Sequence, residues 1–282
     1  MNLPEFSIEG STAIVTGASR GIGRSIALVL AEAGADVGIA ARSEAPLNEV
    51  AAQVRDLGRK CVAVPTDITK EEDVARLVSS VIDGLGRVDI LVNNAGIAIV
   101  KPMVPLPGFK PAGAAELPGF FEPTSVDEWD QVLDVNLKSM MLTSKYAIPK
   151  MIDAGGGSII NMSSIDGLRG SGFGGFDYSV SKGGVIALTT SMAVQHGREN
   201  IRVNCIAPGY LYTPMVAGIL TEETRDLRRR AGPLGTEGTA WDVAWAAVFL
   251  ASDEARWVSG VVLPVDAGLL ATTPLAMLPH LR

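Results

Sequence analysis

Residues 12–23 read Thr-Ala-Ile-Val-Thr-Gly-Ala-Ser-Arg-Gly-Ile-Gly, and this stretch decides the fold expected for the chain. Its first five residues predict a buried strand, and apolar residues after its last glycine recur at helical spacing. Glycines in such a turn let the backbone approach a pyrophosphate, and the helix N-terminus offers it free N–H groups. Alternatively, the turn needs glycine only for its backbone angles.

Outward from this turn, short apolar runs alternate with helical stretches along most of the chain. That alternation predicts βαβ units, and therefore an α/β fold with a doubly wound parallel sheet and helices on both faces. The expected strands are 12–16, 36–40, 61–64, 88–92, 158–161, 201–206 and 261–265. No linker or internal repeat divides the 282 residues, so we expect one domain over 1–282.

Composition excludes several classes of protein. With 24 basic and 31 acidic residues the net charge is −7, which disfavours nucleic-acid and anionic-membrane surfaces. No apolar run reaches about 18 residues and no secretory signal opens the chain, so we expect a cytoplasmic protein. Two cysteines and two histidines leave no ligand set for a metal and no disulfide framework.

Two segments depart from the alternation. Residues 101–124 contain six prolines, so neither a helix nor a central strand is expected there. The segment leaves the carboxyl end of a strand, where open α/β sheets bind ligands. We interpret it as a lid or wall of a substrate pocket, with Phe109, Phe120 and Phe121 as apolar contacts; an oligomer contact is the alternative. The apolar tail 268–282 is expected to be buried.

The end of the second expected strand bears on the choice of a nucleotide. NAD-specific sites place an acid about 20 residues after the glycines, but this chain has Ala41 and Arg42 there. Arg42 can bind a 2′-phosphate, and Arg20 supplies a second cation. This favours NADP(H) and leaves NAD(H) possible, because a solvated arginine at the start of a helix gives the same pattern.

Tyr178 and Lys182 lie four residues apart, within one helical turn. A free tyrosine needs its pKa of about 10 lowered by about three units, or about 4 kcal/mol, to exchange protons at neutral pH. One positive charge at about 4 Å supplies about that much. We therefore expect Lys182 to lower the pKa of Tyr178, although such pairs also occur by chance on surfaces.

At this point the chain resembles the short-chain dehydrogenases/reductases over about residues 8–268. The motifs stand in family order: Thr16 to Gly23, Asn93-Asn94-Ala95-Gly96, Asn136 in Val-Asn-Leu, Ser163-Ser164, Tyr178-x-x-x-Lys182, and Pro208-Gly209 with Thr213. The resemblance implies one Rossmann-like domain that moves a hydride between a nicotinamide cofactor and a ketone or secondary alcohol.

The resemblance also implies roles for particular residues. Tyr178 would be the general acid/base, and Lys182 would lower its pKa and hold the nicotinamide ribose. Ser164, which Gly167 follows at the family spacing, would hydrogen-bond the substrate oxygen. The backbone of Asn136 would hold a water on a proton path from Lys182.

A larger set of residues would contact the cofactor. Asp67 would bind the adenine amino group, or would cap the next helix, and Asn93 would tie neighbouring strands. The implied contacts are Gly17, Ser19, Arg20, Gly21, Ile22, Gly23, Arg42, Asp67, Ile68, Asn94, Ala95, Gly96, Tyr178, Lys182, Pro208, Gly209, Leu211 and Thr213.

The pocket-forming stretches carry no cluster of fixed charges, which favours a neutral ketone, a cyclic diol or a similar hydroxylated compound as substrate. Their apolar or mixed side chains are Phe173, Phe176, Tyr210, Tyr212 and Met215. The helix over 179–197 is apolar on more than one side, and such a helix is buried on both faces. A homo-oligomer, a dimer or a tetramer, would bury it.

Three functions remain in order. The first is an NADP(H)-dependent carbonyl reductase, reversible as an alcohol dehydrogenase. The second is an NAD-dependent dehydrogenase of a sugar, steroid or diol. The third, a cofactor-binding regulator without turnover, is disfavoured because Tyr178 and Lys182 are both present.

Overall fold

A seven-stranded parallel sheet forms the centre of the molecule, in the order β3-β2-β1-β4-β7-β8-β9. The computed structural model describes residues 6–99, 124–170, 175–218, 220–273, 276–277 and 280, and the backbone of 103–104 and 120–121. The strands are β1 (Thr12–Thr16), β2 (Asp36–Ala41), β3 (Cys61–Pro65), β4 (Ile90–Asn93), β7 (Gly157–Met162), β8 (Ile201–Pro208) and β9 (Val262–Val265). The predicted doubly wound parallel sheet is confirmed.

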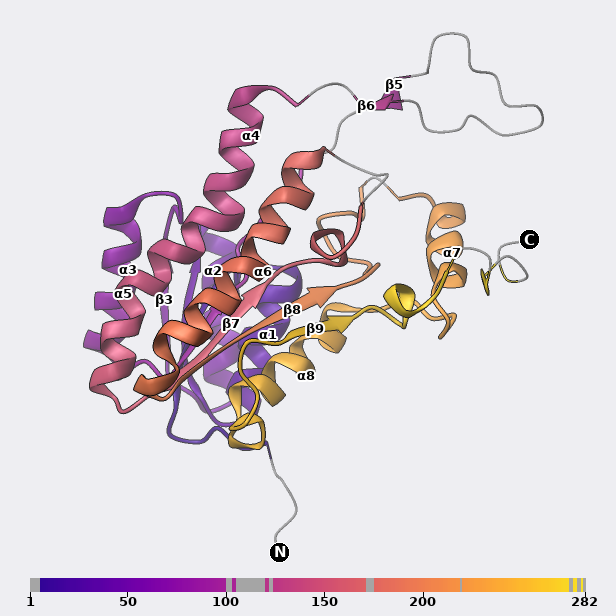
Figure 1. Cartoon of the computed structure of the whole chain (residues 1–282). Helices are drawn as coiled ribbons and strands as arrows, with labels where there is room; N and C mark the ends of the chain where they lie inside the picture. The colour runs from indigo at the N-terminus through magenta and orange to yellow at the C-terminus, as the bar shows by residue number, and fades with distance from the viewer. Residues whose placement is uncertain are drawn as a thin grey trace, which may run out of the picture.

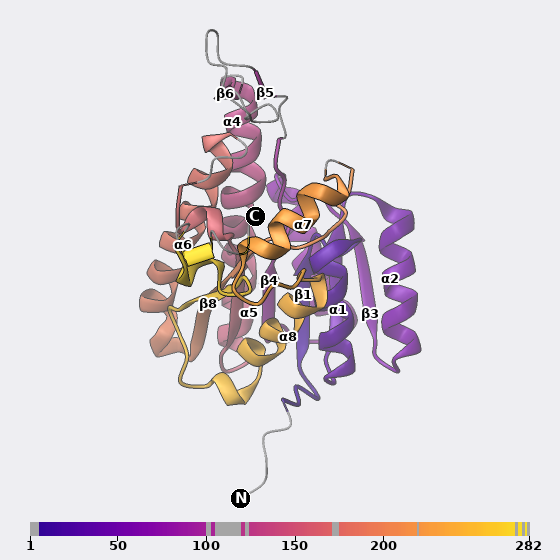
Figure 2. The ribbon, with the colours of Figure 1, turned by 90° about the vertical axis from the view of Figure 1, so that its right-hand side faces the viewer.

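Helices cover both faces of the sheet (Figure 1). One face carries α1 (Gly21–Glu32), α2 (Glu44–Asp56) and α8 (Ala240–Ala251), and the other carries α3 (Glu71–Leu85), α5 (Ser139–Asp153) and α6 (Phe176–His196). Figure 2 shows α1 and α8 near one another on the same side of the sheet, where they pack together. Helix α7 (Glu222–Ala231) lies beyond the carboxyl end of β8.

Side chains of the central strands alternate between two cores, because successive residues of a strand point to opposite faces. Ile14, Leu91 and Ile159 are register partners on β1, β4 and β7, and all three are fully buried on the face of α3 and α5. The next residue of each strand packs on the face of α1 and α8. Each buried side chain of this kind contributes about 1.5–3 kcal/mol. These rows fix the register and thereby bring the carboxyl ends of the strands to one edge.

Residues 101–124 contain two short strands that the sequence did not predict. β5 (Met103–Val104) and β6 (Phe120–Phe121) pair antiparallel with each other, apart from the main sheet and near the start of α4 (Val126–Leu133) in Figure 1. Neither strand contains a proline, so the ladder can form despite the composition of the segment. The predicted lid contacts Phe109, Phe120 and Phe121 lie outside the described side chains.

The tail after β9 returns to the protein over its described residues. Leu269, in the short 3₁₀-helix η5 (Leu269–Ala271), and Met277 are both buried. The carbonyl of His280 accepts a hydrogen bond from Arg230 of α7 at 3.4 Å. The predicted burial of the tail is therefore confirmed at these positions, while 274–275, 278–279 and 281–282 lie outside the described residues.

Candidate active site

The turn between β1 and α1 leaves no room for side chains. Gly17 has φ of +67°, in the region that favours glycine. A Cβ on Gly17 would lie 2.9 Å from the Cα of Ala95, and a Cβ on Gly23 would overlap the Gly17 carbonyl oxygen. Gly21 lies opposite the loop that follows β8, where a Cβ would contact Pro214 at 3.5 Å. The turn is thus held between the end of β4 and that loop.

The start of α1 fits the pyrophosphate of a dinucleotide. Its N-cap residue, Arg20, has an extended backbone, and no side chain caps the first N–H groups. Unpaired N–H groups and the helix dipole favour an anion at such a terminus. Ser19 and Ile22 are half-buried beside it, and Arg20 is exposed.

Asn94 holds the glycine turn in place with its side chain. Its Nδ2 donates to the carbonyls of Thr16 at 2.9 Å and Gly17 at 3.3 Å. The N–H groups of Asn94 and Ala95 both donate to the Thr16 hydroxyl, at 3.0 and 3.1 Å. Sequence reasoning missed Thr16 as a supporting residue, because a threonine at the end of a strand is ordinary in sequence.

Asn93 ties the strands together, as predicted. Its Nδ2 donates to Asn161 Oδ1 of β7 at 2.9 Å, and Asn161 in turn donates to the Thr189 hydroxyl of α6 at 3.0 Å. All three side chains are buried. The network therefore fixes α6, which carries Tyr178 and Lys182, against β4 and β7.

Arg42 follows β2 directly and is exposed, as is Arg20. Asp67 stands after β3, where its Oδ1 accepts hydrogen bonds from the N–H and the hydroxyl of Thr69, at 3.2 and 2.8 Å. The N-cap of α3 is Lys70, so the alternative that Asp67 caps this helix is wrong. Ile68 beside it is buried.

Ser164 and Tyr178 meet beyond the carboxyl end of β7. Ser164 is buried, Tyr178 lies half-buried in the first turn of α6, and their hydroxyls share a hydrogen bond. Burial raises the pKa of Tyr178 to about 12; the hydrogen bond opposes this shift in part, and the charge of Asp166 adds to it. Tyr178 therefore keeps its proton at neutral pH. Neighbouring Ser163 instead donates to the Lys182 carbonyl at 2.8 Å.

The Lys182 ammonium is buried and donates to the Met162 carbonyl at 2.9 Å, and its Nζ lies 5.7 Å from the centre of the Tyr178 ring. Burial lowers the pKa of Lys182 to about 8. The expectation that Lys182 brings the pKa of Tyr178 below 10 is wrong for this arrangement. Loss of water outweighs the attraction, and the ammonium bonds a carbonyl oxygen rather than the phenol.

Asn136 lies in a five-residue π-helix, η1 (Asp134–Lys138), between α4 and α5. Its side chain is fully buried and bonds both backbone groups of Ile97: Nδ2 donates to the carbonyl at 2.9 Å and Oδ1 accepts from the N–H at 2.8 Å. π-helical turns inside α-helices often occur at functional sites. The irregular turn here aims Asn136 at the chain leaving β4.

Ser181 links Asn136 to the reactive tyrosine, and the sequence analysis missed it. Its hydroxyl accepts from Asn136 Nδ2 at 3.1 Å and donates to the Tyr178 carbonyl at 2.7 Å. A Cβ on Gly96 would stand 3.4 Å from both Lys182 Nζ and Asn136 Oδ1. The structure thus brings Asn136, Gly96 and Lys182 together. The Tyr-x-x-x-Lys spacing could have drawn attention to the serine that it encloses.

The loop after β8 closes the other side of the site. Pro208 ends the strand, and Gly209 lies so near Asp266 that a Cβ would meet its Cα at 2.6 Å. Leu211 is buried, and its N–H donates to the Gly209 carbonyl at 3.0 Å. Thr213 starts the turn that carries Pro214 over Gly21.

Two arginines meet Tyr210 in this loop. Arg169 Nη2 donates to the Tyr210 hydroxyl at 3.0 Å, and the Arg228 guanidinium of α7 lies 4.6 Å from the centre of the ring. The prediction that the pocket-forming stretches hold no cluster of fixed charges is wrong at this edge. It failed because these three residues lie far apart in the sequence and only the fold brings them together.

With this geometry established, comparisons with known proteins define the family. A family model described as enoyl-(acyl carrier protein) reductase matches residues 17–270. A cis-4-hydroxycyclohexanecarboxylate dehydrogenase of Sinomonas cyclohexanicum is 39% identical over 92% of this chain and 96% of its own. A 3-oxoacyl-[acyl-carrier-protein] reductase of Thermotoga maritima is 34% identical over 93% of this chain and 99% of its own.

A solved structure agrees with these relatives. A 7α-hydroxysteroid dehydrogenase, complexed with NADH and 7-oxo glycochenodeoxycholic acid, superposes with a TM-score of 0.84 at 32% identity, over 95% of this chain and 97% of that one. The chain belongs to the short-chain dehydrogenase/reductase family of oxidoreductases.

Two searches for other kinds of site gave no candidate within the described ranges. No helix there is long and apolar enough to cross a membrane. No group of three or more His, Cys, Asp or Glu side chains in the same part of the chain is arranged to hold a metal ion.

Proposed function

We propose that this protein is an NADP(H)-dependent oxidoreductase that transfers a hydride between the nicotinamide and a ketone or secondary alcohol. The observation that carries the proposal is the meeting of Ser164, Tyr178 and Lys182 at the carboxyl edge of the sheet, beside the glycine turn of residues 16–23. This edge is where open α/β sheets bind their ligands.

Tyr178 is the general acid in the direction of reduction. Because its pKa is about 12, the phenol is neutral at physiological pH and can give its proton to a developing alkoxide. In the direction of oxidation the same oxygen takes the proton of the alcohol. The Ser164 hydroxyl, bonded to Tyr178, binds the substrate oxygen on which charge develops.

Lys182 and Asn136 are proposed to hold the cofactor ribose and to lead the proton outward. The buried Lys182 ammonium lies next to Gly96 and Asn136, in a region that the hydrogen bonds of Asn136 keep rigid. With a pKa of about 8, Lys182 can exchange a proton near neutral pH. The proposed path runs from Tyr178 past Lys182 towards the backbone of Asn136.

The remaining implied residues are proposed to bind the cofactor, which supplies the hydride when bound. The turn at Gly17, Gly21 and Gly23 and the start of α1 hold the pyrophosphate. Asp67 and Ile68 bind the adenine, while Ala95 and Gly96 contact its ribose. Pro208, Gly209, Leu211 and Thr213 orient the nicotinamide.

NADP(H) is proposed over NAD(H) because Arg42 and Arg20 both stand where a 2′-phosphate would lie, and neither pairs with a carboxylate of the described chain. NAD(H) is the second candidate, and the structural neighbour complexed with NADH favours it. The segment 101–124 is proposed as the substrate lid, and a neutral cyclic ketone or alcohol remains the starting substrate class.

A panel of ketones and secondary alcohols, followed by nicotinamide absorbance with each of the four cofactor forms, tests the proposal. We expect turnover of at least one cyclic ketone with NADPH. Turnover with NADH alone would contradict the cofactor assignment. Binding of both reduced cofactors without turnover of any compound would favour the regulator instead.

A further inference from the structure

Arg169, Tyr210 and Arg228 form a cationic cluster at the rim of the candidate active site. Arg169 bonds the Tyr210 hydroxyl, while the Arg228 guanidinium lies 4.6 Å from the ring centre. Arg169 also lies near the ring, 5.6 Å from its centre. Three separate elements supply the cluster: the chain after β7, the loop after β8, and α7.

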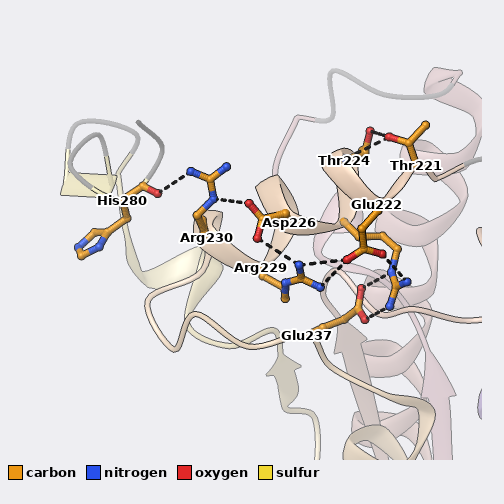
Figure 3. A network of polar contacts seen from close by, with 9 residues as sticks. Thr221, Glu222, Thr224, Asp226, Arg229, Arg230, Glu237 and His280 are labelled. Atoms are coloured by element: carbon orange, nitrogen blue, oxygen red, sulfur yellow. Dashed lines mark hydrogen bonds and ion pairs between the residues drawn. The ribbon is translucent and has the colours of Figure 1, made fainter.

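The other arginines of α7 are already neutralised, as Figure 3 shows for the network around Glu222 and Asp226. Arg225 makes two bonds to Glu237, at 3.0 and 2.6 Å, and Arg229 bonds both Glu222 and Asp226. Arg230 pairs with Asp226 at 2.7 Å. By contrast, neither Arg169 nor Arg228 has an ion pair with any carboxylate of the described residues.

Both guanidiniums have lost part of their hydration. Arg169 Nε is buried and has no hydrogen-bond partner among the described atoms. Arg228 is half-buried, and burial lowers its pKa. Partly desolvated cations attract an anion more strongly than solvated ones do. Asp166 and Glu237 act on Arg228 only at longer range, and Glu237 is bound to Arg225.

The cluster adjoins the reacting groups. Arg169 follows Ser164 by five residues, across the single turn η2 (Ile165–Gly167). The charge of Asp166 acts on both Tyr178 and Arg228, so all three lie within electrostatic reach of one another. Counting Arg169, Arg228 and Asp166 leaves one net positive charge at this rim.

We propose that Arg169 and Arg228 bind a carboxylate of the substrate, so that the protein acts on ketones or alcohols that also carry a carboxylic acid. This inference rests on the proposed function and replaces its neutral substrate by an anionic one. The planar guanidinium matches a carboxylate with two parallel hydrogen bonds. Tyr210 is a positioning residue, since it holds both guanidiniums and leaves the carboxylate to them.

Calorimetry with benzoate and benzamide tests the site without turnover, because these two probes share a ring and differ in the charge of one group. We expect the full-length chain to bind benzoate more tightly than benzamide. Arg169→Gln and Arg228→Gln are each expected to weaken benzoate about 10–100-fold, the size of a lost hydrogen bond to a charged group, and benzamide less than 2-fold. Arg228→Lys should give an intermediate loss, since it keeps the charge and loses the fork.

A matched control removes one positive charge elsewhere. Arg198 is exposed and lies at the far end of α6, before β8 begins, so Arg198→Gln should leave both probes unchanged. Equal weakening of benzoate and benzamide in the Arg228 variants would show that the arginines only support the loop, and would overturn the proposal. Absence of benzoate binding to the wild-type chain would do the same.

Kinetics separate this inference from the proposed function. We expect a keto acid, levulinate, to exceed its methyl ester in kcat/KM, and Arg228→Gln to abolish that preference mainly through KM. A protein that reduces both compounds equally well contradicts the carboxylate site alone. A protein that binds benzoate selectively and reduces no ketone contradicts the proposed oxidoreductase alone.

Discussion

Burial moves the pKa values of the two ionisable side chains at the centre of the site in opposite directions. It raises that of Tyr178 to about 12 and lowers that of Lys182 to about 8. Both shifts disfavour the charged form, because phenolate and ammonium lose water. A neutral phenol suits proton donation to an alkoxide. The proposed oxidation of an alcohol should therefore speed up as the pH rises, while reduction should not.

Lys182 is expected to cost stability at neutral pH. In the unfolded chain its pKa is about 10.5, against about 8 when folded, so between these values the unfolded chain binds more protons and stability rises with pH. Below pH 8 both states are protonated and the cost is complete. Lys182→Met should therefore stabilise the protein at pH 7 by about 1–3 kcal/mol, and the gain should vanish by about pH 10.5.

Urea unfolding of the Lys182→Met variant and the wild type, from pH 7 to 10.5, measures this difference. Comparing the two proteins cancels the thiols of Cys61 and Cys205, whose pKa values burial raises to about 11. Lys60→Met, at an exposed lysine, is the control and should follow the wild type. A variant that is less stable at pH 7 would contradict the cost assigned to this ammonium.

Arg42 is expected to set the preference for the phosphorylated cofactor. A hydrogen-bonded ion pair with a phosphate is worth about 1.5–3 kcal/mol, so Arg42→Ala should weaken NADPH binding about 10–100-fold and leave NADH nearly unchanged. Fluorescence titration of the reduced nicotinamides measures both. Equal weakening, or no change, would mean that Arg42 is a solvated arginine at the start of α2.

Among the elements, the turn between β1 and α1 depends on close packing as well as on backbone angles. Gly17 and Gly58 both have positive φ, +67° and +80°, but only Gly17 faces a neighbour, the Cα of Ala95. Alanine at either position costs about 1–2 kcal/mol for its conformation. Gly17→Ala must in addition displace the end of β4.

We therefore expect Gly17→Ala to lower the free energy of unfolding by clearly more than Gly58→Ala does, and to weaken dinucleotide binding at the same time. Thermal unfolding and cofactor titration of the two variants give the comparison. The same loss in both would mean that the turn uses glycine only for its angle.

The elements of the sheet could be predicted from the sequence because parallel strands buried on both faces are continuous apolar runs. The glycine turn and Tyr178 with Lys182 could be found because their spacing is local. The partners of these residues could not. Asn94 bonding Thr16, Ser181 bonding Asn136, and Arg228 meeting Tyr210 all depend on which elements lie side by side. Likewise, the direction of the Tyr178 pKa depends on burial, which spacing does not reveal.

For the whole molecule, the outer face of α6 favours the proposed homo-oligomer. The helix was expected to be buried on both faces, yet Val180 is 47% exposed and Val194 is 83% exposed in the single chain. A second copy of the chain packed on this face would bury both side chains. Exposed apolar positions at helical spacing are typical of such a contact.

Val194→Glu is expected to convert the oligomer into a smaller species, because the interface would bury an unpaired carboxylate. Light scattering coupled to gel filtration at micromolar concentration reads the mass directly. Val126→Glu, at a 74% exposed position on α4, is the control and should keep the wild-type mass. A wild-type monomer would reject the assembly outright.

The central claim is that the neutral Tyr178 phenol transfers the proton while the dinucleotide site stands independently of it. Tyr178→Phe removes one hydroxyl and keeps the ring, so the fold and the glycine turn should persist. The decisive measurement is kcat of this variant on the best ketone of the panel, beside its affinity for NADPH. We predict that kcat falls at least about 1,000-fold while the affinity changes less than about 3-fold. A variant that retains substantial turnover would contradict the claim.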